Sequence, residues 1–574
     1  MVPNPDFRLQ LREHLLAHCD RILLRIVMGP EFDSPVELTG ADILAGATAL
    51  ADQYAPGCTD GVVLLLLPHS PQLYLLHIGL ILRGCIPGIL SWPTSRVDPE
   101  KYKRNLVHQL RNLPARTLIT LPRLAKSLSA ALPYSTSGCA TVNSETHEKS
   151  FPTGPIKDTL ERRVEAVQND QPLSETLFLQ FSGGTTGSQK AIVVTASMLA
   201  AQIESLGRRL ALTASDSVVS WLPMYHDMGL IACFWLPLWY GAQSLHIGAN
   251  DWVLKPELLL KNISRYGANF CWMPNFSFSY LSQRRNAMKG PWRLDTLRAW
   301  INCSEPCRSS SMQTFADTFA DWGVRKESLQ ASYAMAETVF AITQTQLGSP
   351  PATLHRSRVR DGSRAAGGLS FDLIDAVFVS SGRPLDDTEV AIVNSGGLCD
   401  EEEAGEIHVR TPSLFAGYWG VEGFKTHSLK GGWHATGDYG FRSGDDVFVI
   451  GRLKDVVIIG GQNVFPEDVE LVVSSIEGVY PGRAVAFGIE DREYSTEALA
   501  IVAEQKGDYD PEIATILEQE IRQAVMASIG ISPRRVLVVP QRWIVKSTAG
   551  KISRRETRER FLHESFPSAQ VEVA

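Results

Sequence analysis

The sequence predicts an α/β protein of at least two domains, and three observations support this prediction. The chain has 574 residues, which is more than one hydrophobic core usually serves. From about residue 40 to residue 340, strand-like apolar runs alternate with segments of helix length, as in helices layered on mainly parallel sheets. Strand-rich sequence follows, at residues 389–393, 405–409 and 447–450.

A charged segment marks the predicted domain boundary. Gly451-Arg-Leu-Lys-Asp455 separates two apolar strands, 447–450 and 456–459, so we expect an N-terminal domain over residues 1–450 and a small α+β domain over 451–574. We expect a helix at 511–528 and a basic tail after Pro540. The Gly- and Pro-rich stretch 348–368 is expected to be an irregular insertion or long loop.

Composition excludes several classes of protein. The chain is 44% apolar and 21% charged, has a net charge of −8 and contains no polybasic block, so we expect neither nucleic acid nor an anionic membrane as the main partner. The apolar runs 62–67 and 73–82 are too short to span a membrane and predict a buried strand followed by a core helix. The nine cysteines are scattered and the first ten residues are polar, which favours a reduced, cytoplasmic protein without a signal peptide.

The stretch 181–190, Phe-Ser-Gly-Gly-Thr-Thr-Gly-Ser-Gln-Lys, predicts a polyphosphate-binding loop. Glycines permit the turns, successive N–H groups form an anion site, and Lys190 adds a positive charge. Apolar runs on either side predict that the loop joins two strands. A Walker A motif is excluded, because Gly187 and Lys190 are not adjacent and Ala191 follows the lysine. A solvent-exposed turn without a ligand is the alternative.

Two further segments carry candidate polar groups. In residues 220–230, the pair His226-Asp227 follows a Pro-containing turn and could orient an anionic group; a histidine packed in a turn is the alternative. In residues 332–338, Glu337 follows a mostly apolar run and could hold Mg²⁺ on the same phosphates, since Mg²⁺ takes one or two carboxylates plus phosphate oxygens. A solvated glutamate at a helix start is the alternative there.

The C-terminal third supplies the remaining candidates. A carboxylate such as Asp438, in His-Ala-Thr-Gly-Asp, can accept hydrogen bonds from both ribose hydroxyls, and Arg452 could brace the same sugar. In Lys546-Ser-Thr-Ala-Gly-Lys551, a lysine on a small mobile domain could deliver charge to a distant site. Taken singly, each of these residues is more often a turn residue or a surface charge.

All these segments occur in the order and at the spacing of the adenylate-forming superfamily, which contains acyl-CoA ligases, peptide-synthetase adenylation domains and luciferases. Within it the chain most resembles the fatty acyl-AMP ligases, through residues 221–230, 273–278, 303–306 and 333–337. This resemblance implies a large N-terminal adenylation domain of layered sheets and helices with a small β-subdomain. It also implies a small, mobile α+β C-terminal domain that turns about a hinge at Lys454.

The resemblance implies an ATP-dependent ligase of lipid or natural-product biosynthesis. It would convert a carboxylic acid, expected to be a fatty acid, into acyl-AMP with release of pyrophosphate, using Mg²⁺. It would then pass the acyl group to the phosphopantetheine thiol of an acyl carrier protein acting in trans. Ala336 and the insertion-like stretch favour the carrier protein, whereas Lys190 favours free CoA as the acceptor. A ligase for a shorter or aromatic acid, or a catalytically silent nucleotide-binding homologue, would carry the same motifs.

The resemblance also assigns roles to individual residues. The phosphates would be bound by Ser182, Gly183, Gly184, Thr185, Thr186, Gly187 and Lys190, and the metal by Glu337 and Thr185. The adenine would lie between the backbone of Ser304, Glu305 and Pro306 and the ring of Tyr333, and ATP would also be bound by Ser332, Ala334 and Met335. Asp438 and Arg452 would hold the ribose, and Lys551 would bridge the carboxylate and the α-phosphate. The acyl pocket would be lined by Trp221, His226, Asn275, Phe276 and Cys303.

Overall fold

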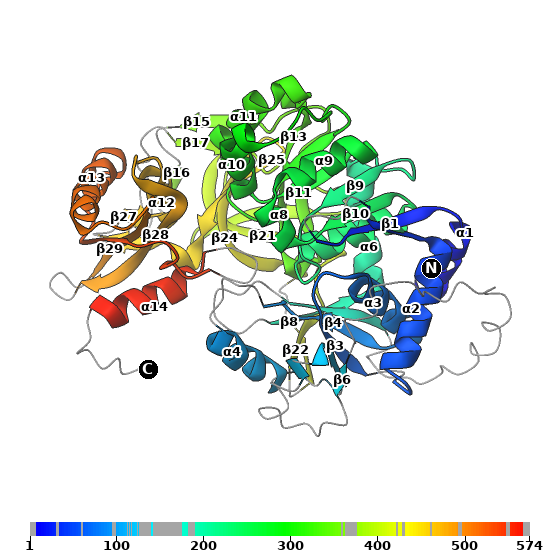
Figure 1. The fold of residues 1–574 in the computed structure, drawn as a ribbon. Helices are drawn as coiled ribbons and strands as arrows, with labels where there is room; N and C mark the ends of the chain where they lie inside the picture. The colour runs from blue at the N-terminus through cyan, green and yellow to red at the C-terminus, as the bar shows by residue number, and fades with distance from the viewer. Residues whose placement is uncertain are drawn as a thin grey trace.

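The computed structural model describes residues 7–29, 34–58, 61–93, 99–111, 113, 115, 117–122, 124–125, 139–141, 175–181, 190–356, 360–361, 376–420, 423–426, 431–459, 462–491, 496–546 and 552–565. The predicted phosphate-loop residues 182–187 and the predicted catalytic Lys551 lie outside these ranges. The chain folds into a large N-terminal domain and a smaller C-terminal domain, drawn in orange and red in Figure 1. The boundary at residue 451 remains a prediction.

The first sheet has nine strands in the order β18-β14-β13-β12-β11-β9-β10-β1-β2. The strands are β1 (Ile22–Val27), β2 (Val36–Thr39), β9 (Ser217–Ser220), β10 (Gln243–Ile247), β11 (Phe270–Met273), β12 (Ala299–Asn302), β13 (Leu329–Ala334), β14 (Ala341–Gln344) and β18 (Arg383–Pro384). All neighbouring pairs from β1 to β13 are parallel. The parallel centre confirms the predicted α/β class.

The second sheet has the order β23-β22-β8-β7-β4-β3-β5-β6. Its strands are β3 (Val62–Leu66), β4 (Ile86–Ile89), β5 (Thr117–Thr120), β6 (Cys139–Thr141), β7 (Thr176–Phe181), β8 (Ala191–Thr195), β22 (Gly417–Gly420) and β23 (Gly423–Thr426). Every residue of β3 is buried, as expected of a parallel strand covered on both faces. Because β7 and β8 pair antiparallel, the predicted phosphate loop does join two strands.

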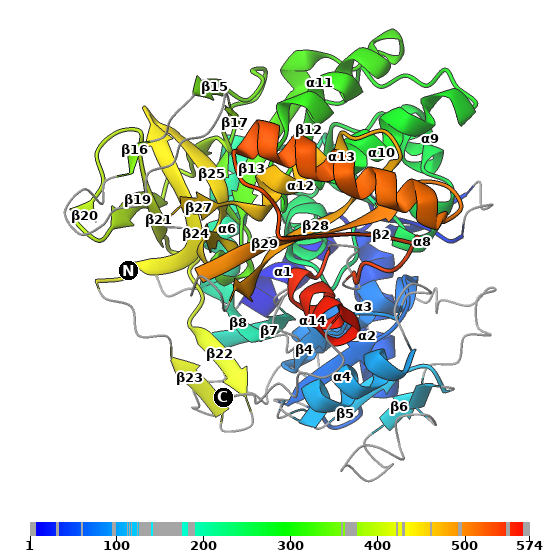
Figure 2. The same cartoon turned by 90° about the vertical axis from the view of Figure 1, so that its left-hand side faces the viewer.

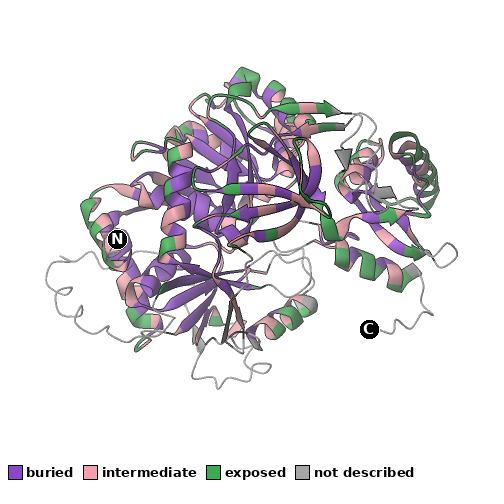
Figure 3. Cartoon of the chain, turned by 180° about the vertical axis from the view of Figure 1, so that it is seen from behind, coloured by how far each residue is buried: buried purple, intermediate pink, exposed green. Residues whose placement is uncertain are grey.

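Helices cover both sheets, and an extensive hydrophobic core in the N-terminal domain is accompanied by separate apolar clusters in the second sheet and in the β-rich part. The helices are α1 (Phe7–Ala17), α2 (Gly40–Tyr54), α3 (Pro71–Arg83), α4 (Pro99–Arg111), α6 (Ala196–Arg209), α7 (Leu236–Trp239), α8 (Ala249–Leu254), α9 (Glu257–Tyr266), α10 (Asn275–Arg284), α11 (Ser309–Thr318) and a π-helix (Met228–Trp235). Helix α2 starts with a capping box in which Thr39 and Asp42 satisfy each other's backbone N–H groups. Figure 3 shows how thoroughly the strands between these helices are buried.

A third, mainly antiparallel sheet forms the predicted β-subdomain, in the order β20-β19-β21-β24-β25 with β16 beside β21. Its strands are β16 (Arg360–Asp361), β19 (Glu389–Asn394), β20 (Gly397–Leu398), β21 (Glu403–Arg410), β24 (His434–Ser443) and β25 (Asp446–Arg452). A further ladder pairs β15 (Thr353–Arg356) with β17 (Ala376–Val379). The expectation that residues 348–368 are irregular was therefore wrong for 353–356 and for 360–361, where the chain extends against partner strands that are distant in sequence.

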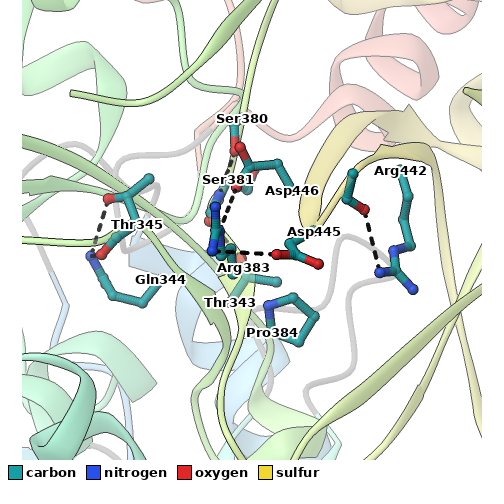
Figure 4. A network of polar contacts seen from close by, with 12 residues as sticks. Thr343, Gln344, Thr345, Ser380, Ser381, Arg383, Pro384, Arg442, Asp445 and Asp446 are labelled. Atoms are coloured by element: carbon teal, nitrogen blue, oxygen red, sulfur yellow. Dashed lines mark hydrogen bonds and ion pairs between the residues drawn. The ribbon is translucent and has the colours of Figure 1, made fainter. Parts of the chain in front are cut away.

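A polar network fastens this third sheet to the edge of the first (Figure 4). Arg383 of β18 forms an ion pair of 3.3 Å with Asp445, in the turn before β25. Thr343 of β14 donates its hydroxyl to the carbonyl of Ser381 at 2.5 Å. Backbone hydrogen bonds from Ser381 to Val447 at 2.8 Å and from Val447 to Gly382 at 3.0 Å hold the start of β25 against the segment before β18.

The C-terminal domain is a small α+β unit with hydrophobic cores of its own. It contains β26 (Val457–Ile459), β27 (Gln462–Val464), α12 (Pro466–Ser474), β28 (Val479–Asp491), β29 (Thr496–Gln505), α13 (Pro511–Ile529), β30 (Arg535–Val539) and α14 (Arg554–Ser565). Helix α13 confirms the helix predicted at 511–528; Figure 2 shows it crossing in front of the β28–β29 ribbon. Across the described residues, no helix has the length and apolarity needed to cross a membrane.

Candidate functional site

The candidate site lies at the carboxyl ends of four neighbouring strands, β13, β12, β11 and β9. Because these strands are parallel, their carboxyl ends meet at one edge of the sheet, where ligands of open α/β sheets bind. Trp221 follows β9, Asn275 follows β11, the turn 303–306 follows β12, and Glu337 follows β13. The topology thus gathers four segments that are far apart in the sequence.

A buried carboxylate is the centre of the predicted ribose site. Asp438 of β24 and Arg452 of β25 are directly paired in register, and the Arg452 Nε lies 3.1 Å from Asp438 Oδ1. The Tyr333 hydroxyl donates to Asp438 Oδ2 at 2.5 Å. Burial raises the pKa of Asp438, and the Arg452 guanidinium and the Tyr333 hydroxyl oppose that rise. Each carboxylate oxygen can accept a second hydrogen bond, so the group retains capacity for a pair of sugar hydroxyls.

Backbone geometry shapes the predicted adenine-binding turn. Ser304 has a φ of 72°, a left-handed conformation that is uncommon for a residue other than glycine. Its hydroxyl contacts the Met228 sulfur at 3.9 Å, and Glu305 Oε2 accepts a hydrogen bond from the Phe276 N–H at 2.9 Å. Pro306 is exposed. These contacts join the turn after β12 to segments that follow β11 and β9.

The predicted adenine segment 332–335 runs from β13 toward Glu337. The Ser332 hydroxyl donates to the carbonyl of Thr343 at 2.7 Å, so it supports the sheet. Tyr333 is buried, and this burial raises the pKa of its hydroxyl. Ala334 is half-buried and Met335 is buried, with the Met335 N–H bonded to the Phe340 carbonyl at 2.9 Å. The segment is therefore held firmly where it passes the Asp438 carboxylate.

Glu337 sits in a strained turn. It lies in a single 3₁₀ turn, Ala336–Thr338, and the next residue, Val339, has a φ of 66°. A β-branched residue in that region is a genuine outlier, of the kind that surrounding contacts must enforce. Gln180 of β7 supplies one such contact, donating to the Val339 carbonyl at 3.0 Å. The Phe415 N–H supplies another, to the Glu337 carbonyl at 2.7 Å.

The chemistry and the position of the Glu337 side chain suit a magnesium ligand. Its carboxylate is half-buried and accepts a hydrogen bond from the Tyr418 hydroxyl at 3.1 Å on Oε1. No group of three or more His, Cys, Asp or Glu side chains gathers into a metal site within the described ranges. A single carboxylate suits an ion that takes its other ligands from phosphates and water, and Mg²⁺ behaves in this way.

The two predicted lysines approach the same site. The ammonium of Lys190 lies over the Tyr418 ring, 4.5 Å from its centroid. Lys454, in the 3₁₀ turn Leu453–Asp455 between β25 and β26, is close enough to sense Lys190 and Asp438 electrostatically. Partial burial lowers the pKa of Lys454, and the neighbouring Arg452 guanidinium lowers it further. Lys190, at the end of the phosphate loop, and Lys454, at the predicted hinge, therefore interact electrostatically.

Aromatic rings pack together where the acyl pocket is predicted. Trp221 is stacked on Trp252 with ring centroids 3.8 Å apart, and Phe276 meets Trp221 edge-on at 6.0 Å. The sequence interpretation did not include Trp252 of α8. Nothing in the sequence around Trp252 indicates that α8 packs against Trp221, the residue that follows β9. Trp221 and Trp252 are buried, so their stacking is core packing, and Phe276 is the half-buried member of the group.

The other predicted pocket residues differ in accessibility. Cys303 is fully buried. Asn275 Oδ1 accepts hydrogen bonds from Asn302 Nδ2 at 2.9 Å and from the Arg308 N–H at 3.1 Å, so this amide stabilises the 303–308 turn. His226 is half-buried, and its Nδ1 lies 2.5 Å from Asp227 Oδ1. Cys303 is therefore closed to a substrate, whereas Asn275 and His226 are both half-buried.

Sequence interpretation missed three residues that organise the site: Gln180, Arg308 and Tyr418. The only sequence signal for Gln180 is a polar residue inside the apolar run 176–181. Arg308 donates to the Glu467 carbonyl at 3.0 Å and forms an ion pair of 3.6 Å with Asp468, so it connects the adenine turn to α12 of the C-terminal domain. Neither it nor Tyr418 stands out in the sequence, because their partners are far away along the chain.

The parallel sheet edge, the Asp438 carboxylate and the lone Glu337 define a nucleotide-binding enzyme of the adenylate-forming type. The chain belongs to the family of AMP-binding enzymes, whose profile matches residues 12–419. The family match confirms the predicted superfamily and the predicted class, an ATP-dependent acid ligase.

Individual relatives agree with this assignment. The medium-chain-fatty-acid–[acyl-carrier-protein] ligase JamA of Moorena producens is 27% identical over 85% of this chain and 84% of its own length. The long-chain-fatty-acid–AMP ligase FadD32 of Mycobacterium marinum is 27% identical over 68% of this chain and 70% of its own. A fatty acyl-adenylate ligase structure from a study of the E. coli and L. pneumophila enzymes has the same fold, with a TM-score of 0.79 at 20% identity and 99% of each chain covered.

The role of Glu337 leads to a first prediction. Glu337→Gln keeps the shape and the Tyr418 contact but removes the charge that attracts a hard cation, so catalysis should require a higher Mg²⁺ concentration. We expect the rate at saturating ATP to fall on the order of 100-fold, as for other preorganised electrostatic groups. Titrating Mg²⁺ against pyrophosphate release measures both effects.

Glu389→Gln is the matched control for that measurement. Glu389 forms an exposed ion pair with Arg410 in the β-subdomain, and such pairs contribute little. An unchanged Mg²⁺ requirement in Glu337→Gln would show that Glu337 is not a magnesium ligand.

Proposed function

We propose that this enzyme uses ATP to convert a fatty acid into acyl-AMP and pyrophosphate, and then transfers the acyl group to the phosphopantetheine thiol of an acyl carrier protein acting in trans. The observation that carries the proposal is the contact of Asp438 with both Tyr333 and Arg452, at the point where the chain runs from Tyr333 to Glu337 at the carboxyl end of β13. That arrangement supplies a ribose acceptor and a magnesium ligand within one site.

In the first half-reaction, a carboxylate oxygen of the acid attacks the α-phosphorus of ATP, and the bond from that phosphorus to the bridging oxygen breaks to release pyrophosphate. The protein has to align the two reactants and neutralise the charge that develops. Asp438 and Arg452 hold the ribose, Glu337 and Thr185 hold Mg²⁺, and Ser182 through Lys190 hold the β- and γ-phosphates. When bound, Mg²⁺ supplies positive charge to the phosphoryl oxygens. Lys551 adds charge where the carboxylate meets the α-phosphate.

In the second half-reaction, the thiol attacks the acyl carbon, the bond from that carbon to the phosphate oxygen breaks, AMP leaves and the thiol proton is lost. The thiol needs access that Lys551 would otherwise obstruct, so the C-terminal domain turns about Lys454 between the two steps. The short 3₁₀ turn that carries Lys454 supports this role, because a few residues at a strand end can absorb such a rotation.

The fatty acid and the carrier protein are supported by the relatives and by the site. JamA is named for a medium-chain fatty acid and an acyl carrier protein, and FadD32 for long-chain fatty acids. The half-buried Phe276 ring, which packs edge-on against the buried Trp221, suits an apolar tail. We place the reaction in the cytoplasm, in agreement with nine cysteines that are scattered along the sequence without the pattern of a disulfide framework.

CoA is the second candidate acceptor, because Lys190 is typical of CoA ligases and here lies within the site. The purified enzyme would be given ATP, Mg²⁺ and fatty acids of graded chain length, first without a thiol and then with CoA or a holo-carrier protein. We expect pyrophosphate release that varies with chain length, and acyl transfer on the order of 10-fold faster to the carrier than to CoA. Faster transfer to CoA would overturn the acceptor, whereas the absence of pyrophosphate with every acid would overturn the whole proposal.

A further inference from the structure

Tyr418 lies between two groups that the proposed reaction needs. It belongs to β22, which pairs antiparallel with β8 so that Tyr418 is opposite Ile192 and Trp419 is opposite Ala191. This register places Tyr418 beside the residue that ends the phosphate loop. The Lys190 ammonium lies 4.5 Å from the centre of its ring, and its hydroxyl donates to Glu337 Oε1 at 3.1 Å.

The same segment also fixes the main chain of Glu337. The Phe415 N–H donates to the Glu337 carbonyl at 2.7 Å, and the Phe415 ring packs against the Tyr418 ring with centroids 4.8 Å apart. Residues 415–418 therefore hold the glutamate by its backbone and by its side chain. Because the Val339 turn is strained, such contacts are needed to keep Glu337 in one place.

Chemistry explains why an aromatic residue with a hydroxyl suits this position. A lysine and a glutamate in direct contact would form an ion pair and satisfy each other, which would weaken the attraction of each for a phosphate or a metal ion. The ring face offers the ammonium a weaker, electrostatic partner. The hydroxyl uses one oxygen of the carboxylate and leaves Oε2 for another ligand.

We propose that Tyr418 is a positioning residue, which keeps Lys190 and Glu337 apart and aimed at a magnesium-bound triphosphate. This inference rests on the proposed function, since it takes Lys190 as a phosphate ligand and Glu337 as the magnesium ligand. It adds a third residue, from β22, that touches neither ligand and acts through both of these side chains.

The test compares two nucleotides by calorimetric binding, so it does not depend on turnover. The α,β-methylene analogue of ATP, with Mg²⁺, presents the triphosphate and resists cleavage; AMP presents the adenosine and one phosphate. Tyr418→Phe keeps the ring under Lys190 and removes the hydroxyl, and Tyr418→Leu removes both. We expect the triphosphate analogue to bind about 10-fold more weakly to Tyr418→Phe, the loss of one hydrogen bond to a charged group. We expect a greater loss in Tyr418→Leu and unchanged AMP binding in both variants.

Two controls separate positioning from general damage. Tyr102→Phe removes a tyrosine hydroxyl that donates to the Ser91 carbonyl in another part of the domain, and it should bind both nucleotides normally. In a double-mutant cycle, Glu337→Gln and Tyr418→Phe should be non-additive, because the second change acts through the first residue. If Tyr418→Leu fails to fold, Tyr418→Phe alone carries the comparison.

Two results would overturn the inference: wild-type affinity for the triphosphate in Tyr418→Phe, or an equal loss for AMP. The proposed function has a separate readout, acid-dependent pyrophosphate release by the unaltered enzyme. A negative result there with a positive result in the binding comparison would leave Tyr418 as a positioning residue in an enzyme of different chemistry.

Discussion

Asp438→Asn is expected to lower acyl-AMP formation on the order of 100- to 1000-fold, because a buried, preorganised acceptor for the ribose is lost. The neutral amide keeps the size of the side chain but presents donors where the sugar hydroxyls need acceptors. In the native protein, the Arg452 guanidinium and the Tyr333 hydroxyl hold the carboxylate in place, each on one of its oxygens. The loss should appear mainly as weaker binding of ATP and AMP, measured by calorimetry and by the KM for ATP.

Deoxynucleotides make this prediction specific to the ribose. The native enzyme should discriminate strongly against 2′-deoxy-ATP and 3′-deoxy-ATP, whereas Asp438→Asn should treat all three nucleotides almost alike. Arg452→Lys is a milder companion, because Arg452 is half-exposed and the lysine would keep a positive charge near Asp438. Full discrimination by Asp438→Asn would show that another group reads the sugar.

Lys551→Ala is expected to reduce adenylation by a similar factor, on the order of 100- to 1000-fold, while transfer from preformed acyl-AMP to the thiol continues. The proposal places this ammonium between the carboxylate and the α-phosphate in the first step and out of the way in the second. The two half-reactions are measured separately, as pyrophosphate release and as consumption of synthetic acyl-AMP. In the proposed mechanism, rotation of the small domain between the two half-reactions would produce this split.

Lys546→Ala is the matched control. Lys546 belongs to the same segment. Its backbone pairs with that of Ile552 in a single antiparallel β-bridge, close in sequence to the predicted catalytic lysine. Its replacement should leave both half-reactions near their native rates, which would exclude a general effect of removing a lysine from this segment. Equal loss of both half-reactions in Lys551→Ala would contradict the proposal that Lys551 acts only in the first half-reaction.

Sequence patterns predicted the architecture well, because the burial of strands and helices leaves a regular pattern of apolar residues in the sequence. The continuous apolar run of β3 and the alternating segments after it predicted parallel strands, and the flanks of the phosphate loop predicted β7 and β8. The ladder of β15 and β17 was missed, since two short strands separated by a long stretch leave no local signal of their pairing.

Site residues could be predicted where the side chains that carry the chemistry lie within one short sequence motif. Asp438, Arg452 and Glu337 stand in short segments with a distinctive order, and the structure pairs Arg452 with Asp438, which also contacts Tyr333, four residues before Glu337. Gln180 and Tyr418 could not be predicted from the sequence, because each acts through a hydrogen bond to a residue far away along the chain. Gln180 bonds to Val339, 159 residues away, and Tyr418 bonds to Glu337, 81 residues away. Such contacts depend on register between strands, which periodicity does not encode.

The central claim is that a carboxylate attacks the α-phosphorus of ATP, and oxygen labelling tests it most directly. A fatty acid carrying ¹⁸O in its carboxyl group would be turned over with ATP and the thiol acceptor, and the nucleotide product would be analysed by mass spectrometry. We predict AMP that carries one labelled oxygen, left behind when the acyl carbon departs to the thiol. Unlabelled AMP, or ADP together with labelled inorganic phosphate, would contradict the account.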